Sequence, residues 1–302
     1  MAFSLDKLLV IGISSRALFN LETEEAIYQN QGLEAYRQHQ LANENAILQP
    51  GAGFSLVKAL LKLNSLAPDQ RIAEVVVMSR NSSETSLRIF NSIEHYQLDI
   101  TRAALSGGAS LAPYLKAFNV SLFLSLHEDD VQAAIDSGVA SALLYKMPEN
   151  AIDLDQIRIA FDGDAVIFSD ESERIYQEQG VEAFEQHERQ NAKKPLPEGP
   201  FAPLLMALSY LQNNFKTADD AAFPLRTALV TARSSPAHER VIRTLRAWNI
   251  TIDETFFMGG VNKSAVLEAF KPHMFFDDQH GHCSHASMVV PTGRVLIKQP
   301  IA

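Results

Sequence analysis

The sequence predicts an α/β protein built on a parallel sheet with helices on both faces, and three observations lead to this prediction. Short apolar segments typical of strands alternate with segments of helical periodicity. One helical segment occurs twice, at 25–43 and 173–191. Polar residues stand directly after several of the apolar segments, at the positions where α/β sheets bind their ligands.

Length, charge and composition limit the class of protein. The chain has 302 residues and a formal net charge of −10, and at roughly 100–200 residues per domain this length predicts about two domains. An acidic chain lacks the positive surface that binds nucleic acid. A single cysteine, Cys283, excludes an internal disulfide framework. The apolar run Leu8–Ile13 is too short to cross a membrane, so we expect a cytoplasmic protein without a membrane partner.

The repeated segment predicts an internal duplication. EAIYQNQGLEAYRQHQLAN at 25–43 and ERIYQEQGVEAFEQHERQN at 173–191 are identical at eleven of nineteen positions. The pairs Gly107-Gly108 and Gly259-Gly260 also correspond. The constant offset across these nineteen aligned positions indicates two copies of one folding unit. We therefore expect units at 1–152 and 153–302.

Each predicted element of the second half has a local reason. Apolar runs predict strands, and apolar residues at helical spacing predict helices, with Pro195–Pro200 separating two of them. In order, we expect a strand at 157–168 that ends in a polar turn, helices at 171–191 and 201–215, a strand at 227–233, a helix at 237–248, a strand at 254–260, a helix at 263–270 and a strand at 273–278. In the first half, Leu8–Ile13 is expected to be the first strand.

Polar residues that follow these strands predict a phosphoryl-transfer site. They are Asp162, Asp164, Thr231, Arg233, Lys263, Asp277 and Asp278. Because parallel strands end at one edge of a sheet, we expect the side chains to meet there. Crowded carboxylates repel one another, and Mg²⁺, which prefers oxygen ligands, relieves that repulsion. Thr231 and Lys263 suit the anionic oxygens of a phosphoryl group.

These motifs resemble those of a known family. Asp162-Gly163-Asp164-Ala165-Val166 matches the first motif, D-x-D-x-[TV], of the haloacid-dehalogenase superfamily of phosphatases. The segments SSRALF, FDGDAVIFSDESERI, LVTARSS and FFDDQ resemble the cytosolic 5′-nucleotidase I family over nearly the whole chain. The resemblance implies a Rossmann-like sheet of the haloacid-dehalogenase type and a small cap insertion at about 169–226. It also implies hydrolysis of nucleoside 5′-monophosphates, AMP-like in class.

The resemblance further implies a role for each matched residue. Asp162 would attack phosphorus to form an aspartyl-phosphate, and Asp164 would act as general acid and base. Thr231 and Lys263 would hold the phosphoryl oxygens. Mg²⁺ would be bound by Asp162, the backbone carbonyl of Asp164 and Asp278, with Asp277 supporting; which of the last two touches the ion stays open. Arg233 either binds phosphate or orders its loop.

The first half is expected to be non-catalytic. Aligned with the second half, it has Ser14 and Arg16 in place of the two motif aspartates, Met78 in place of Thr231, Leu111 in place of Lys263, and Ser125-Leu126 in place of Asp277-Asp278. Ser14, Ser15 and Arg16 are candidates for contact with an effector nucleotide or the substrate. An interface salt bridge of Arg16 is an equal alternative.

Several alternatives stay open. A phosphatase of another small ester, such as a sugar phosphate, would share the core motifs, and a non-catalytic nucleotide sensor would bind without turnover. A dehalogenase needs neither Asp164 nor the Asp277-Asp278 pair, so the presence of these residues counts against that activity. The tract His280–His285 is expected to be a loop near the site rather than a metal centre, and Tyr176, Phe184, His187 and Phe201 to be fold residues rather than base-stacking ones. Base preference and a homo-oligomeric state are not determined.

Overall fold

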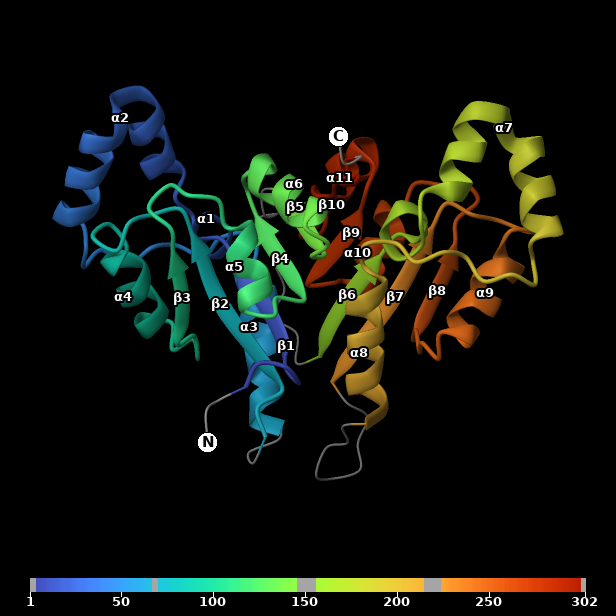
Figure 1. The fold of residues 1–302 in the computed structure, drawn as a ribbon, viewed down its shortest axis with the longest axis horizontal. Coiled ribbons are helices and arrows are strands. Elements are labelled where there is room, and N and C mark those ends of the chain that lie inside the picture. The colour runs from blue at the N-terminus through green and yellow to red at the C-terminus, as the bar shows by residue number, and fades with distance from the viewer. Residues whose placement is uncertain (1–3, 67–69, 146–155, 215–223, 300–302) are drawn as a thin grey trace. The chain divides into compact units, whose positions relative to one another are not determined.

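The computed structural model describes residues 4–66, 70–145, 156–214 and 224–299. It divides into two compact units, unit 1 (Met1–Lys146) and unit 2 (Met147–Ala302). The predicted boundary at 152/153 lies outside the described residues. Both units consist of strands and helices in alternation (Figure 1).

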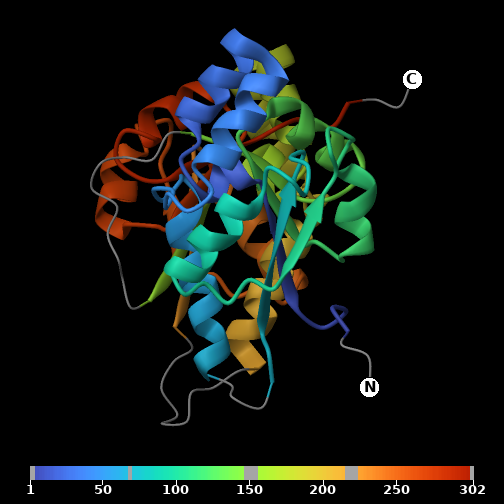
Figure 2. The ribbon, with the colours of Figure 1, turned by 90° about the vertical axis from the view of Figure 1, so that its left-hand side faces the viewer.

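Unit 1 is built on parallel strands in the order β3-β2-β1-β4-β5. Its strands are β1 (Leu9–Ile13), β2 (Ala73–Ser79), β3 (Arg102–Leu105), β4 (Leu122–Ser125) and β5 (Ser141–Leu144). Its helices are α1 (Ser15–Leu18), α2 (Glu22–Ala42), α3 (Phe54–Lys62) with the turn η1 (Leu63–Leu66), α4 (Leu87–His95), α5 (Ala112–Ala117) and α6 (Glu128–Asp136). Figure 2 shows these helices on both sides of the strands, with α2 above their carboxyl ends.

Unit 2 has the order β10-β9-β6-β7-β8, again with parallel neighbours. Its strands are β6 (Ile157–Phe161), β7 (Leu225–Thr231), β8 (Glu254–Phe257), β9 (Met274–Asp277) and β10 (Thr292–Val295). Its helices are the tight turn η2 (Gly163–Ile167), α7 (Glu171–Gln190), α8 (Ala202–Asn214), α9 (His238–Ala247), α10 (Ser264–Phe270) and α11 (His280–Ala286). Both units have the same strand order across the sheet: the unit's third strand in the sequence lies at one edge, followed by its second, first, fourth and fifth. The predicted α/β class with a parallel sheet is confirmed.

Alternate strand residues form the cores of the units. In unit 1, Val10, Met78 and Phe123 pack with residues of α5 and α6 on one face of the sheet. In unit 2, Ala160 and Phe275 pack in the same way with α10 and α11. Successive strand residues point to opposite faces, so buried neighbours such as Ile11 and Phe161 face the other helix layer. None of the described helices has the length and apolar character of a membrane span.

The repeated segments form helical hairpins at the carboxyl ends of the strands. Both α2 and α7 bend at a glycine of positive φ, Gly32 at 84° and Gly180 at 82°, a conformation that L side chains rarely adopt. Tyr28 and Tyr36 then meet edge to face across α2 at 6.0 Å. The predicted cap range 169–226 contains this α7 hairpin, but it also contains α8, whose Leu204, Leu205 and Leu208 are buried, and residues 215–223, which lie outside the described part.

The strand register changes one correspondence between the halves. Ile13 pairs with Val77, and Phe161 pairs with Leu229. Two residues farther along, Ser79 therefore takes the place of Thr231. The Ser79 and Thr231 hydroxyls also accept equivalent backbone N–H groups, from Asn81 at 3.1 Å and Arg233 at 3.2 Å. The expected pairing of Thr231 with Met78 is wrong by one residue, because sequence identity did not fix the register.

Candidate active site

The first motif residue lies directly after the central strand of unit 2. Asp162 follows β6, its backbone N–H donates to Phe276 O at 2.7 Å, and the residue is 4% exposed. The chain then turns sharply through η2, where Ala165 has a positive φ of 59°. A Cβ at Gly163 would lie 3.2 Å from Thr231 Oγ1. Because Gly163 has no side chain, the turn can approach the end of β7 closely. This close approach places Thr231 near Asp162, the residue before Gly163.

A lysine and further carboxylates complete the cluster. Lys263, just before α10, places its Nζ 2.9 Å from Asp162 Oδ1 and 2.6 Å from Asp277 Oδ2. Lys263, Asp162 and Asp277 are buried. His282 Nδ1 lies 3.2 Å from Asp277 Oδ2. Asp278 directly follows β9 and adds a further carboxylate. Five polar groups from three separate segments therefore converge on one edge of the sheet.

Burial and mutual repulsion shift the pKa values of these acids. Burial, with the charges of Asp277 and Asp164, raises the pKa of Asp162 to about 7 despite Lys263. Burial, with the charges of Asp162 and Asp277, raises the pKa of Asp278 to about 8. Burial opposes ionisation of Asp277 as well, but the hydrogen bond with His282 and the charge of Lys263 hold its pKa below the ordinary value. Without a cation, ionisation of Asp162 and Asp278 is therefore opposed near neutral pH.

Three of these carboxylates form a candidate metal centre. Asp162, Asp277 and Asp278 each offer an oxygen, and the three oxygens lie within 4.8 Å of one another. Within the described ranges, this is the one group of three or more His, Cys, Asp or Glu side chains arranged in this way. An all-oxygen, acidic donor set fits a hard divalent cation, and such a cation would offset the mutual repulsion that contributes to the raised pKa values of Asp162 and Asp278. A cavity of about 220 Å³ adjoins Lys263 and His282.

Arg233 does not point into this cluster. Its guanidinium donates to Asp164 from Nε at 2.8 Å and from Nη2 at 2.6 Å, and to Glu188 Oε2 from Nη1 at 2.5 Å. Glu188, on α7, also accepts from Arg240 at 2.9 Å and from Ser172 at 2.9 Å. A buried ionic chain, Asp164–Arg233–Glu188–Arg240, thus connects the first motif to the α7 hairpin.

The histidine tract forms helix α11, so the expectation of a loop is wrong. On a helix His280 and His282, two residues apart, do not share a face, and none of the tract's side chains belongs to the candidate metal-binding group found among the described residues. The segment instead fixes the end of β9. The Gln279 backbone N–H donates to Asp277 Oδ1 at 2.9 Å, and the Cys283 thiol donates to Asp277 O at 3.3 Å. Burial raises the pKa of Cys283, so this thiol is not an activated nucleophile.

The corresponding edge of unit 1 lacks the acidic cluster but is hollow. Ser14, Leu111 and Ser125 occupy the positions of Asp162, Lys263 and Asp277. Arg16, in the place of Asp164, pairs with Glu22 at 2.8 Å and Glu25 at 3.2 Å. A cavity of about 480 Å³ opens here, larger than the 220 Å³ cavity beside Lys263.

Comparisons with known proteins agree with the motifs. A family model described as 5′-nucleotidase matches residues 1–300. The chain belongs to the 5′-nucleotidase family. It is 42% identical over 286 residues to human cytosolic 5′-nucleotidase 1B, an alignment that covers 92% of this chain and 47% of that protein. The chain thus spans about half the length of this curated relative. The resemblance to the cytosolic 5′-nucleotidase I family is confirmed. No solved structure matches the chain significantly.

Of the aromatic residues expected to be fold residues, Phe201 is buried and Tyr176 is 47% exposed. Phe201 is fully buried against Phe161 and Phe276. Tyr176 and Phe184 meet edge to face at 6.2 Å, in the arrangement that Tyr28 and Tyr36 have in α2.

The sequence does not single out two residues of the candidate site. Glu188 lies within the repeated segment, which by itself predicts only a shared fold, yet it carries the contact with Arg233. The signal was visible, because the corresponding residue of the first half is the neutral Gln40. His282, which contacts Asp277, was set aside with the histidine tract.

Proposed function

We propose that unit 2 is an Mg²⁺-dependent phosphatase that hydrolyses nucleoside 5′-monophosphates, and that unit 1 is its non-catalytic counterpart. The observation that carries this proposal is the buried contact of Lys263 with Asp162 and Asp277, beside Asp278. A nucleophilic carboxylate, a fixed cation and a metal-binding group of carboxylates are what the displacement at a phosphate monoester requires. Family membership supports nucleotides as the substrate class.

The cation would be held by Asp162 and Asp278 through their side chains and by the backbone carbonyl of Asp164, with Asp277 in support. When bound, Mg²⁺ supplies positive charge that neutralises the phosphoryl oxygens. Asp277 already pairs with Lys263 and His282, which favours Asp278 as the direct ligand.

The chain's own groups divide the remaining work. An Asp162 oxygen forms a bond to phosphorus while the bond from phosphorus to the ribose 5′-oxygen breaks. Asp164, once one of its oxygens leaves Arg233 and takes up a proton from solvent, gives that proton to the 5′-oxygen. Asp164 then takes a proton from a water molecule that attacks the aspartyl-phosphate, which releases phosphate and restores Asp162. Lys263 and Thr231 hold the phosphoryl oxygens throughout.

Arg233 is a positioning residue in this scheme. Both of its donors toward the first motif are occupied by Asp164, and its third goes to Glu188. A guanidinium whose three nitrogens all donate to carboxylates of the protein presents no free pair of nitrogens to a phosphate. We assign it to orienting the general acid and to coupling Asp164 to the α7 hairpin, in place of the phosphate contact.

The finer architecture belongs to the same proposal. The shared strand order, the glycine bends of α2 and α7 and the matched edge-to-face rings support a duplication of one unit of the haloacid-dehalogenase type. The α7 hairpin is the candidate cap. We also propose a cytoplasmic location, which the cytosolic designation of the human relative supports.

Phosphate release from a panel of nucleoside monophosphates and sugar phosphates tests the proposal. We expect release from nucleotides with Mg²⁺, none with EDTA, and a loss of about 10³-fold or more in Asp162→Asn. Asp253→Asn, which changes an acid that binds the backbone N–H of Thr227 at 2.8 Å, is the control. Preference for sugar phosphates would support the other small-ester phosphatase, and nucleotide binding without release would support a sensor.

A further inference from the structure

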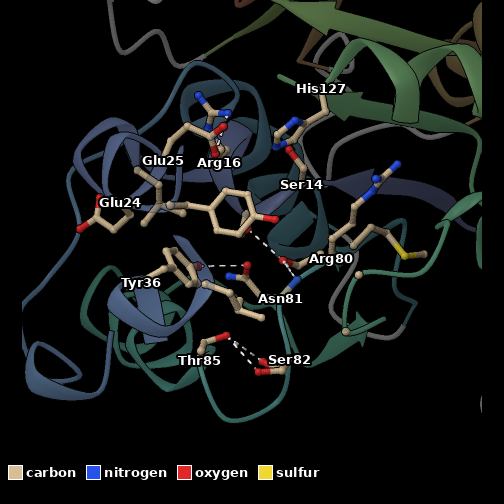
Figure 3. Close-up of a pocket in the computed structure, with 18 of the residues that line it drawn as sticks. Ser14, Arg16, Glu24, Glu25, Tyr36, Arg80, Asn81, Ser82, Thr85 and His127 are labelled. Atoms are coloured by element: carbon tan, nitrogen blue, oxygen red, sulfur yellow. Dashed lines mark hydrogen bonds and ion pairs between the residues drawn. The ribbon is translucent and has the colours of Figure 1, made fainter. Parts of the chain in front are cut away.

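The cavity of unit 1 has the size of a ligand site. Its volume of about 480 Å³ lies within the range of roughly 300–1,000 Å³ typical of small-molecule pockets. Figure 3 shows Arg16, Ser14 and His127 on one side of it and Tyr36, Asn81 and Thr85 on the other. It lies under the α2 hairpin at the carboxyl ends of β1 and β2, where α/β folds bind ligands.

Two buried donors at this cavity have no hydrogen-bond partner among the described residues. They are Arg16 Nε and Asn81 Nδ2. Tyr36 donates to Asn81 Oδ1 at 3.0 Å and accepts from Gln40 at 3.0 Å, which fixes the amide group and leaves its nitrogen unpaired. Buried donors without partners are costly. Both belong to side chains that line the cavity, so a ligand with acceptor atoms that draws these side chains toward the cavity would satisfy them.

The charges of the lining disfavour an anion. Three arginines line the cavity against four carboxylates, namely Arg16, Arg37 and Arg80 against Glu24, Glu25, Glu84 and Asp130. Each arginine is already engaged: Arg16 with Glu22 and Glu25, Arg37 with Glu84, and Arg80 with Asp130. Leu111 stands where unit 2 has Lys263. A phosphate group would meet a lining whose arginines and carboxylates sum to a negative formal charge, and whose arginines are each paired with a carboxylate.

The remaining surface suits a planar ring joined to hydroxyl groups. Tyr28, Tyr36 and Leu33 of α2 and Met78 of β2 supply apolar and aromatic contacts. Ser14, Ser15 and Ser79 supply hydroxyls, two of which, Ser15 Oγ and Ser79 Oγ, lie 3.0 Å apart. Burial raises the pKa of Tyr36, which keeps its hydroxyl protonated.

We propose that the cavity of unit 1 binds an uncharged nucleoside-like molecule, a planar ring carrying a hydroxylated sugar, without converting it. We propose this site in place of the effector-nucleotide contact that Ser14, Ser15 and Arg16 suggested in the sequence. Binding needs neither a metal nor turnover, so its failure is distinct from failure of the phosphatase proposal.

Calorimetric titration of the full chain with adenosine in EDTA tests this site. We expect saturable binding that weakens at least tenfold in Tyr28→Ala and in Asn81→Leu. Tyr176→Ala is the matched control, because Tyr176 is the corresponding residue of unit 2 and is 47% exposed, compared with 49% for Tyr28. Thermal melting shows whether each variant is folded. If Asn81→Leu does not fold, Tyr28→Ala still tests the site, because Tyr28 is exposed.

Three results would overturn the proposal. The first is that adenosine does not bind. The second is that Tyr176→Ala or Lys263→Met abolishes binding while Tyr28→Ala does not, which would place adenosine in unit 2. The third comes from Lys263→Met protein titrated with AMP: binding tighter than that of adenosine and dependent on Arg16 would identify an anion site. We expect AMP to bind this protein at least tenfold more weakly than adenosine.

Discussion

Replacing Arg233 by lysine separates two roles for this residue. Arg233 makes three charge-assisted hydrogen bonds to two carboxylates while it is 4% exposed. Lysine keeps the charge but cannot span Asp164 and Glu188 with a planar fork. Arg233→Lys therefore tests positioning while the site stays cationic.

The expected size of the effect follows from these contacts. Breaking a buried ion pair costs about 3–5 kcal/mol, and one retained charge-assisted bond returns about 1.5–3 kcal/mol. The free energy of unfolding should therefore fall by about 1–3 kcal/mol. Because displacement of a catalytic group by about 1 Å costs on the order of 10²-fold, kcat should fall by about 10²-fold with KM nearly unchanged.

Urea unfolding and steady-state phosphate release measure the two quantities. Arg243→Lys is the control, because Arg243 pairs with Glu239 at 2.8 Å on an exposed face of α9. It should change stability by at most about 0.5 kcal/mol. A raised KM with wild-type kcat in Arg233→Lys would refute the positioning role, because that pattern marks a lost substrate contact.

Two further predictions concern stability. In EDTA, the folded pKa values of about 7 for Asp162 and about 8 for Asp278 exceed the ordinary value of 3.8. The folded state then binds more protons than the unfolded one, so stability should fall as pH rises from about 4 to 8. Mg²⁺ should oppose this fall and Asp162→Asn should reduce it; melting temperatures that rise equally in both proteins would contradict the assignment. Gly199→Ala should destabilise by about 2–4 kcal/mol, because its Cβ would lie 2.3 Å from Phe168 O and 2.6 Å from Val166 O. Gly281→Ala, where nothing lies within 4 Å, should stabilise α11 by up to about 1 kcal/mol, and equal effects of the two changes in chemical denaturation would disprove the steric argument.

Local patterns in the sequence carried most of the element prediction. The apolar runs form β6, β7, β8 and β9. Strands β6, β8 and β9 are shorter than predicted because the polar turns at their ends are not strand, and β7 begins and ends two residues earlier than predicted. Strand β10 (Thr292–Val295) was not predicted. Its sequence TGRV contains a glycine and a charge, and the pairing with β9 that makes it a strand is not visible locally.

The sequence by itself determined which chemistry-bearing residues the chain has, in what order, and that one half lost them. Motif spacing and strand periodicity are local properties, so they can be read along the chain. The tertiary structure decided where those side chains point: Arg233 toward Asp164 and Glu188, and Ser79 into the place of Thr231. These outcomes depend on contacts between residues 45 or more positions apart and on strand register, which no local pattern encodes.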